Sequence, residues 1–178
     1  MKDFSRSNPY FSLCGLNCKL CPMNLAGHCS GCGFNNQSCK IAKCSLEHGK
    51  IEYCFQCDNF PCEKYENITA FDSFITHQNQ MTDIEKVKRI GLSAYNSEQE
   101  EKSRILDYFL SNYNDGRKKT LFCIAVNLLE IVELQEVVKK LEADKEFHME
   151  LKEKSALAAK HLQDMAAKRN IILKLRKK

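Results

Sequence analysis

The sequence predicts a mainly α-helical protein in which a small, cysteine-rich, metal-stapled N-terminal module with a short hairpin packs on a C-terminal bundle of four to five helices. Ten of the eleven cysteines and five of the seven glycines lie within residues 14–62. Beyond them, Glu, Lys and Leu dominate, and apolar residues recur at helical spacing. We therefore expect a metal-binding module at residues 1–62, a helical domain at 63–143, and a long amphipathic helix with a basic tail at 144–178.

The cysteine-rich segment is too short to fold on an apolar core alone. Domains below roughly 70 to 80 residues usually need disulfides, a metal or a partner. The opening residues, MKDFSRSNPYFSLCG, lack the apolar run of a secretory signal, which favours a reducing, cytoplasmic environment. Clustered thiols in that environment indicate a metal rather than disulfides. The candidate ligands are Cys14, Cys18, Cys21, Cys29, Cys32, Cys39, Cys44, Cys54, Cys57 and Cys62.

The number of thiols suggests two zinc ions. Zinc prefers four tetrahedral ligands, and a closed site of four cysteines is structural because no position is left for water or substrate. One plausible pairing is Cys18, Cys21, Cys29 and Cys32 at one ion, and Cys39, Cys44, Cys54 and Cys57 at the other, with Cys14 and Cys62 as alternates. Interleaved pairings fit the spacing equally well.

The first three cysteines have an alternative interpretation. Radical enzymes that use S-adenosylmethionine hold three irons of a four-iron cluster by a C-x3-C-x2-C spacing, and Cys14, Cys18 and Cys21 have that spacing. Those enzymes resemble barrels of alternating strands and helices, an alternation that this sequence lacks. Because thiolate ligation alone does not separate zinc from iron, an iron-sulfur redox enzyme stays the alternative.

The expected elements can be placed in order along the chain. Ile51, Tyr53 and Phe55 alternate with other residues, which predicts a short hairpin leading into a knuckle at Cys54 and Cys57. Two capping boxes, Thr82 with Glu85 and Ser97 with Glu100, predict the starts of two helices. The first should span about 83–95. The second should place its apolar stripe toward the core: Ile105, Leu106, Phe109, Leu110 and Tyr113.

Three further helices should follow the turn at residues 114–116. The third, 120–129, is apolar on nearly all sides and should be buried. The fourth carries Leu134, Val137, Val138 and Leu141 on one side. The fifth should run from Asp144 nearly to the end, with an apolar side of Phe147, Leu151, Ala158, Leu162, Met165 and Ile172. Its polar remainder suggests a helix laid on the surface or on a protein partner.

Two basic segments are candidate anion sites. Arg117, Lys118 and Lys119 precede the third helix, where its free amides could help to bind a phosphate or carboxylate; a solvated turn is the other interpretation. The tail holds six bases and no acid after residue 167, which is a feature of nucleic-acid binders. The chain lacks Trp, finger spacing and an aromatic platform, so nucleic-acid or phosphate binding is an alternative and not the main expectation.

Other functional classes have little support in the sequence. There is no recognisable nucleophile motif and no glycine-rich phosphate loop, so a binding or adaptor protein is favoured over an enzyme. No segment approaches the roughly 18 consecutive apolar residues of a membrane span, so we expect a soluble protein without membrane contact. The lone Cys123 lies on the apolar third helix, where a buried cysteine behaves as a small hydrophobe.

Several motifs occur in one order: CGLNCKLC, CSGC, C-x4-C, YCFQCDNFPCEKY, AYN and NDGRKKTLFCIAVNLLE. In this order they resemble the domain-of-unknown-function 3795 family of small bacterial and archaeal proteins, over about residues 10–142. The resemblance implies a cysteine-rich zinc-binding domain without a settled activity. It extends the ligand expectation to all ten cysteines of the module, and marks Asp115, Gly116, Arg117 and Cys123 as part of the family pattern. The stretch after Asp144 lies outside the resemblance.

Overall fold

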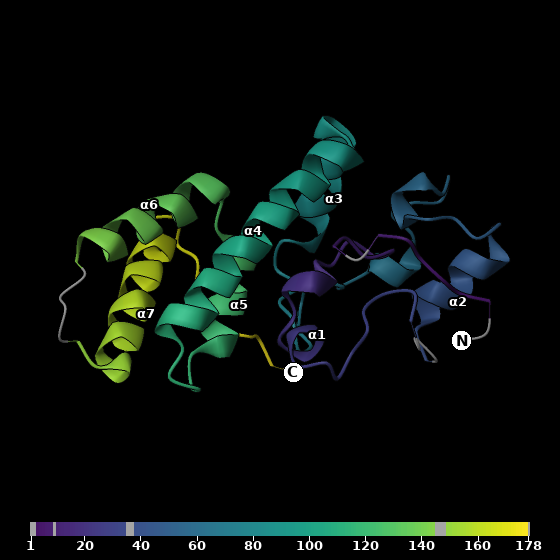
Figure 1. Cartoon of the computed structure of the whole chain (residues 1–178). Helices are drawn as coiled ribbons and strands as arrows, with labels where there is room; N and C mark the ends of the chain where they lie inside the picture. The colour runs from purple at the N-terminus through teal and green to yellow at the C-terminus, as the bar shows by residue number, and fades with distance from the viewer. Residues whose placement is uncertain (1–2, 9, 35–37, 145–148, 178) are drawn as a thin grey trace.

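The computed structural model describes residues 3–8, 10–34, 38–144 and 149–177, and every regular element in these ranges is helical. Figure 1 shows the cysteine-rich N-terminal segment, which we call the module and follow as far as Tyr65, on one side of the molecule and the helices α4 to α7 on the other. The predicted mainly α class is confirmed. The hairpin expected around residues 51–55 is wrong, because no strand occurs in the described ranges.

Local turn chemistry explains why the alternating segment does not form a strand. The backbone amide of Tyr53 donates to Oε1 of Gln56 at 2.9 Å, and the amide of Cys57 donates to the carbonyl of Cys54 at 3.0 Å. These bonds close the short 3-10 helix η2, Cys54–Gln56. The alternation in the sequence therefore reflects the burial of Tyr53 and not the pleat of a sheet.

The module consists of short turns and loops with a very small core of its own. Its elements are η1 (Cys18–Leu20), α1 (Pro22–Leu25), α2 (Lys40–Glu47), η2 and η3 (Glu63–Tyr65). Among its described residues, the cluster that lies wholly inside it has Phe4, Leu13 and Ala42 as its buried members, with partly buried side chains such as Ile41 and Ile51 against them. A core of this size stabilises little structure, so the module depends on other contacts.

The helical half begins with two helices separated by Gly91. Helix α3 spans Gln80–Ile90 and α4 spans Leu92–Tyr113. Gly91 has φ +83°, a conformation that glycine adopts without strain, and it ends α3 while starting α4. Both predicted capping boxes are wrong. Helix α3 starts before Thr82, and Ser97 lies inside α4, where its hydroxyl donates to the carbonyl of Ser93.

The remaining helices are α5 (Lys119–Leu128), α6 (Ile131–Ala143) and α7 (Leu151–Ala167). The predicted third and fourth helices are confirmed, and residues 122–128 of α5 are all buried, as its apolar composition predicts. Helices α4 to α7 share one apolar core, into which Leu20 of the module also inserts. The apolar side of α7, with Ala158 and Leu162, is buried in this core.

A second apolar cluster joins the module to α3 and α4. It contains Phe11, Tyr53 and Tyr65 from the module, Ile84 and Val87 from α3, and Tyr95 from α4. The rings of Phe11 and Tyr95 meet edge-on, with centroids 4.9 Å apart. Residues of the module therefore take part both in this cluster and in the core shared by α4 to α7, so the module is packed on the helices at two places.

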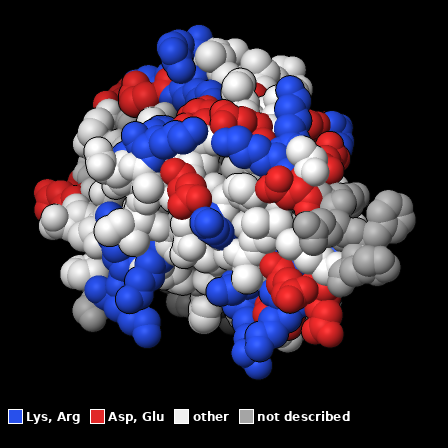
Figure 2. Space-filling model, turned by 90° about the vertical axis from the view of Figure 1, so that its left-hand side faces the viewer, with Lys and Arg blue, Asp and Glu red and all other residues white. Residues whose placement is uncertain are grey.

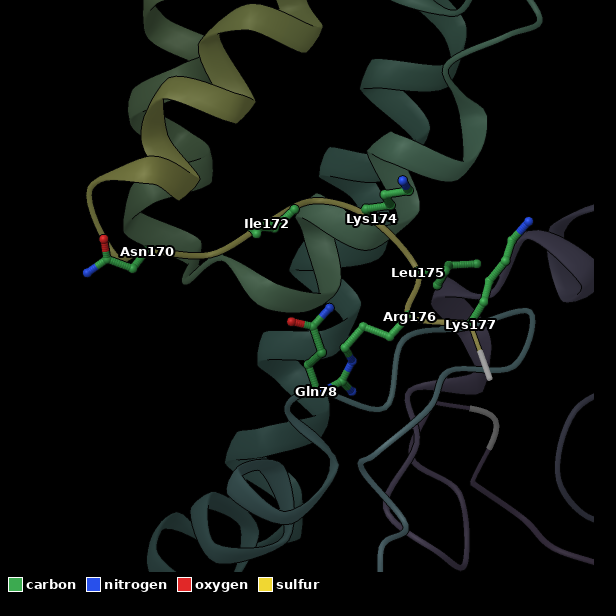
Figure 3. Close-up of a pocket in the computed structure, with 7 residues that line it drawn as sticks. All are labelled: Gln78, Asn170, Ile172, Lys174, Leu175, Arg176 and Lys177. Carbon is green, nitrogen blue, oxygen red and sulfur yellow. The ribbon is translucent and has the colours of Figure 1, made fainter.

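The chain after α7 departs from the predicted long helix. Helix α7 starts at Leu151 and ends at Ala167; Phe147 lies outside the described residues. The tail then runs without helical structure back across the molecule, and Ile172 is 75% exposed. Together with Gln78, this tail lines a cavity of about 580 Å³; Figure 3 shows the side chains that line it. In the described ranges, no helix is long and apolar enough to cross a membrane.

Asp72 holds the tail in place. The backbone amide of Arg176 donates to Oδ2 of Asp72 at 2.6 Å, and its guanidinium Nη2 lies 3.1 Å from Oδ1. The amide of Asp72 donates in turn to the carbonyl of Arg176 at 2.9 Å. The side chain of Asp72 is fully buried by these contacts. The tail is therefore attached to the loop that leads from the module into α3.

Candidate metal centre

All eleven cysteines are free thiols. Those of the module lie on its turns, at the ends of short helices or in loops, where the chain changes direction. Cys123 lies apart, inside α5, and is 2% exposed. Burial raises the pKa of Cys123 to about 12, so its thiol stays protonated at neutral pH. The expectation that Cys123 behaves as a core hydrophobe agrees with this position.

Four cysteines line one small cavity of about 20 Å³, and we name them the Cys57 group: Cys44, Cys54, Cys57 and Cys62. Cys44 comes from α2, Cys54 begins η2, Cys57 follows η2, and Cys62 precedes η3. Apolar side chains, among them Ile41, Ile51 and Phe60, form the rest of the cavity wall. The turns of the module thus bring together thiols that are up to eighteen residues apart in the sequence, between positions 44 and 62.

Four other cysteines share a second neighbourhood, and we name them the Cys14 group: Cys14, Cys18, Cys32 and Cys39. Burial is the largest cause that raises the pKa values of Cys14, Cys18 and Cys32. The charges of other thiolates raise these pKa values further: Cys39 acts on Cys14, Cys14 and Cys39 act on Cys32, and Cys14, Cys32 and, more weakly, Cys21 act on Cys18. Four mutually repelling thiolates are the arrangement that a bound cation would relieve.

Backbone amides point at every sulfur of the Cys14 group. The thiol of Cys14 accepts a bond from the amide of Leu16, that of Cys18 from the amide of Cys32, and that of Cys32 from the amide of Leu13. Each of these bonds lowers the pKa of the thiol that accepts it. The amide of Ala42 donates to Sγ of Cys39 at 3.4 Å. An amide donor favours the ionised form of a thiol, which is the form that ligates metals.

Cys21 and Cys29 belong to neither group. Cys21 is buried at the end of η1, and its thiol interacts with Cys29, with Lys119 and, across the interface with α5, with Cys123. The structure therefore leaves Cys21 and Cys29 as the two extra cysteines. The pairing considered from the sequence instead left Cys14 and Cys62 outside the two four-cysteine sets. Within the C-x3-C-x2-C segment, Cys18 interacts with both Cys14 and Cys21, and Cys21 also lies near Cys123 of α5.

The thiols of both groups are gathered without being closed around one point. Across the described ranges, no three His, Cys, Asp or Glu side chains have the arrangement needed to hold a metal ion. The donor chemistry of the Cys57 group nevertheless suits zinc, because four cysteines line one small apolar cavity.

Two residues beside the cysteines were not expected from the sequence to belong to the site. Nδ1 of His48 lies 3.6 Å from Sγ of Cys44, at the end of α2. The hydroxyl of Tyr65 donates to the carbonyl of Cys14 at 3.3 Å and also bonds the thiol of Cys54. Tyr65 thus contacts both cysteine groups. The i,i+4 spacing of Cys44 and His48 on a helix was the available signal for His48.

The three basic residues before α5 lie at its N-terminus, as the sequence predicts. Arg117 is exposed, and Lys118 is the residue that precedes the helix. The carboxylate of Asp115 accepts a bond from the amide of Arg117 at 3.0 Å, which lowers the pKa of Asp115. Lys119 lies near the thiols of Cys21 and Cys123. An anion site at residues 117–119 stays a prediction, and Asp115 already supplies one carboxylate there.

The basic residues that follow α7 are largely paired with acids. Arg169 Nη1 lies 3.0 Å from Glu133, Lys168 lies 3.7 Å from Glu136, and Arg176 is bound to Asp72. Figure 2 shows basic and acidic side chains interspersed over the face that carries α6 and α7. In Figure 3, Lys174 and Lys177 extend away from the tail backbone. On this face the tail does not form a continuous basic surface.

The comparisons with known proteins complete the description of the site. No protein-family model matches the chain, and no curated protein and no solved structure is similar enough to count as a match.

Proposed function

We propose that this chain is a zinc-binding protein whose N-terminal module holds two structural zinc ions by cysteine thiolates. The observation that carries the proposal is the lining of one small cavity by the four thiols of the Cys57 group. The Cys14 group, with its backbone amides and mutual repulsion, would hold the second ion. Bound zinc would neutralise the thiolates and supply folding free energy that the three-residue core of the module does not provide.

The proposed sites differ from those of an iron-sulfur enzyme. A cluster of the radical type would use Cys14, Cys18 and Cys21 together; Cys21 interacts with Cys18, but it also lies near Cys29, and near Cys123 and Lys119 on α5. The eight thiols of the two groups are the number of ligands that two four-cysteine sites would need. Closed sites leave no position for substrate, which supports a binding or adaptor role and not catalysis at the metal.

We also propose that the chain is a member of the domain-of-unknown-function 3795 family. The support is the order of its cysteine motifs and of the NDGRKKTLFCIAVNLLE segment. The segment has a clear structural task, because it forms the turn before α5 and the buried helix itself. Its Cys123 interacts with Cys21 of the module, so these two motifs meet at one interface.

Metal analysis of matched variants tests the proposal. For protein prepared anaerobically without chelator, we expect two zinc ions per chain and no visible absorption. Cys57→Ser should retain one ion, because it removes a ligand of only one site, and Cys29→Ser should retain two. Elemental analysis with a visible spectrum gives all these results. Iron with visible absorption would establish the cluster alternative, and a metal-free wild-type protein would contradict both.

A further inference from the structure

A polar cavity lies away from the cysteines, between α3, α4, the turn that joins α5 to α6, and the residues that follow α7. Its volume is about 250 Å³, well above the roughly 10–15 Å³ that one water molecule needs. Charged side chains line it from every side: Asp83 and Lys86 from α3, Lys102 from α4, Glu130 from the turn, and Arg169 after α7. A cavity with this many convergent charges differs from an ordinary packing defect, which is apolar.

Most of these charges already have partners in the protein. Lys86 Nζ lies 2.5 Å from Glu98 and 3.0 Å from Glu130, and Arg169 is paired with Glu133 at 3.0 Å. Lys102 is different. It is 5% exposed, forms no ion pair among the described residues, and makes one bond, from Nζ to the carbonyl of Asn127 at 3.3 Å. An ammonium has three donors, so a buried lysine with one long bond is incompletely satisfied.

Gln99 presents a complementary group one turn earlier on the same helix. It is 2% exposed and lines the same cavity, and its Oε1 has no hydrogen-bond donor among the described residues. Buried polar atoms are nearly always bonded, and a buried acceptor without a donor calls for an explanation. The carboxylate of Asp83, on another wall of the cavity, is a second acceptor. The same cavity is thus lined by an incompletely bonded cation, Lys102, by an acceptor without a donor, Gln99, and by the carboxyl group of Asp83.

We infer that this cavity binds a free amino acid or an amino-acid-like zwitterion. The ligand's carboxylate would be held by Lys102, and its ammonium by Gln99 and Asp83. Residues three apart on a helix have Cβ atoms about 5–6 Å apart. Lys102 and Gln99 can therefore bind a carboxylate and an ammonium that belong to one small ligand and are separated by a few bonds, as in an α-amino acid. A simple anion would leave Oε1 of Gln99 without a donor, and a simple amine would leave Lys102 without an anion.

Gln78 adds a further donor at the edge of the cavity. Its Nε2 is buried without an acceptor among the described residues, and Gln78 lines both this polar cavity and the tail cavity drawn in Figure 3. A ligand carboxylate could therefore receive bonds from Lys102 and Gln78 together. The residues after α7 form part of the wall, so the tail held by Asp72 encloses the site from one side.

Calorimetric titration of the full chain tests the inference. The probes are the twenty standard L-amino acids, with acetate and methylammonium as ligands that carry only one of the two charges. We expect at least one amino acid to bind with 1:1 stoichiometry, and neither acetate nor methylammonium to match its affinity. Lys102→Met and Gln99→Met should each weaken this binding about tenfold or more, because each removes a bond to a charged group. Arg104→Met, on the exposed side of α4, should bind like wild type.

The outcomes that overturn the inference are distinct. They are the absence of binding by every amino acid, binding that survives Lys102→Met and Gln99→Met unchanged, or acetate binding as tightly as the amino acid. Lys102→Met removes a buried charge that acts on Asp83, so the folding of this variant is checked by circular dichroism. If circular dichroism shows that it does not fold, Gln99→Met alone decides the result, since it preserves side-chain length and all charges.

Discussion

At the scale of single residues, Gly15 shows how closely the first cysteine is fitted to the helices. Its φ is +94°, and a Cβ added there would lie 2.7 Å from Cδ1 of Ile84 and 3.1 Å from the carbonyl of Gln80. The neighbouring carbonyl of Cys14 accepts bonds from Nε2 of Gln80 at 2.8 Å and from the hydroxyl of Tyr65. Cys14 is thus held in place by α3 as well as by its own module.

We predict that Gly15→Ala destabilises the protein by about 1–3 kcal/mol, because it adds both backbone strain and a steric clash with Ile84. Gly27→Ala is the matched control: Gly27 has φ +73°, but a Cβ there would meet nothing within 4 Å. Urea denaturation of the two variants and wild type measures the difference in the free energy of unfolding. Equal losses for both variants would show that strain alone matters and that Gly15 does not contact α3.

The identity of the candidate ligands could be predicted from the sequence, but their grouping could not. Ten cysteines in one segment are visible in the sequence, whereas the neighbours of Cys14 depend on how the module docks on α3 and α4. The polar cavity did have a signal. Tyr95, Gln99, Lys102, Leu106 and Phe109 recur at helical spacing on the buried side of α4. Two polar residues in such a stripe indicate a buried polar site.

At the scale of elements, the helix boundaries are set by glycine and by tertiary contacts more than by capping motifs. Gly91 ends one helix and begins the next, although the sequence predicts a helix that continues through it. Helix α5 was predictable, because an apolar segment of ten residues has only one stable place, inside the core. The tail was not, because its position depends on Asp72, which lies 104 positions before Arg176 in the sequence.

We predict that Asp72→Asn releases the tail from the loop before α3 and lowers the free energy of unfolding by about 1–3 kcal/mol. Burial would raise the pKa of Asp72, but bonds from Arg176 and His77 outweigh it and hold this pKa below its ordinary value. The stabilisation is therefore present above the ordinary pKa of aspartate and is lost as the pH falls through the lowered one.

Hydrogen exchange at residues 170–177 measures the release of the tail directly. Exchange should accelerate in Asp72→Asn and stay as in wild type in Asp164→Asn, which removes an exposed carboxylate from α7. Unchanged protection in Asp72→Asn would mean that other contacts hold the tail.

At the scale of the whole molecule, a polar network crosses the junction between the module and the helices. Asp83 accepts bonds from Nδ2 of Asn17 at 2.9 Å and from Nδ2 of Asn79 at 2.6 Å, and the hydroxyl of Tyr95 donates to Asn17 at 3.0 Å. Burial raises the pKa of Asp83 to about 7, although Lys102 and these bonds act in the opposite direction. The junction is therefore sensitive to pH.

We predict that wild type loses stability relative to Asp83→Asn as the pH rises from about 4 to about 7. The ordinary pKa of aspartate is about 3.9, so between that value and about 7 the folded state binds more protons than the unfolded state. The free energy of unfolding then falls with rising pH, by an amount on the order of a few kcal/mol. Urea denaturation over this range measures it, with the exposed Asp107→Asn as control. Parallel profiles for wild type and Asp83→Asn would contradict the prediction.

The most direct test of the central claim is alkylation of the native protein with N-ethylmaleimide, read by mass spectrometry for each cysteine, with and without a zinc chelator. Cys29 is exposed and belongs to neither group, so it should react at once. The eight cysteines of the Cys14 and Cys57 groups should be protected until the chelator is added and should then react together within each group. The same labelling with and without chelator would contradict the account, because it would mean that no metal holds these thiols.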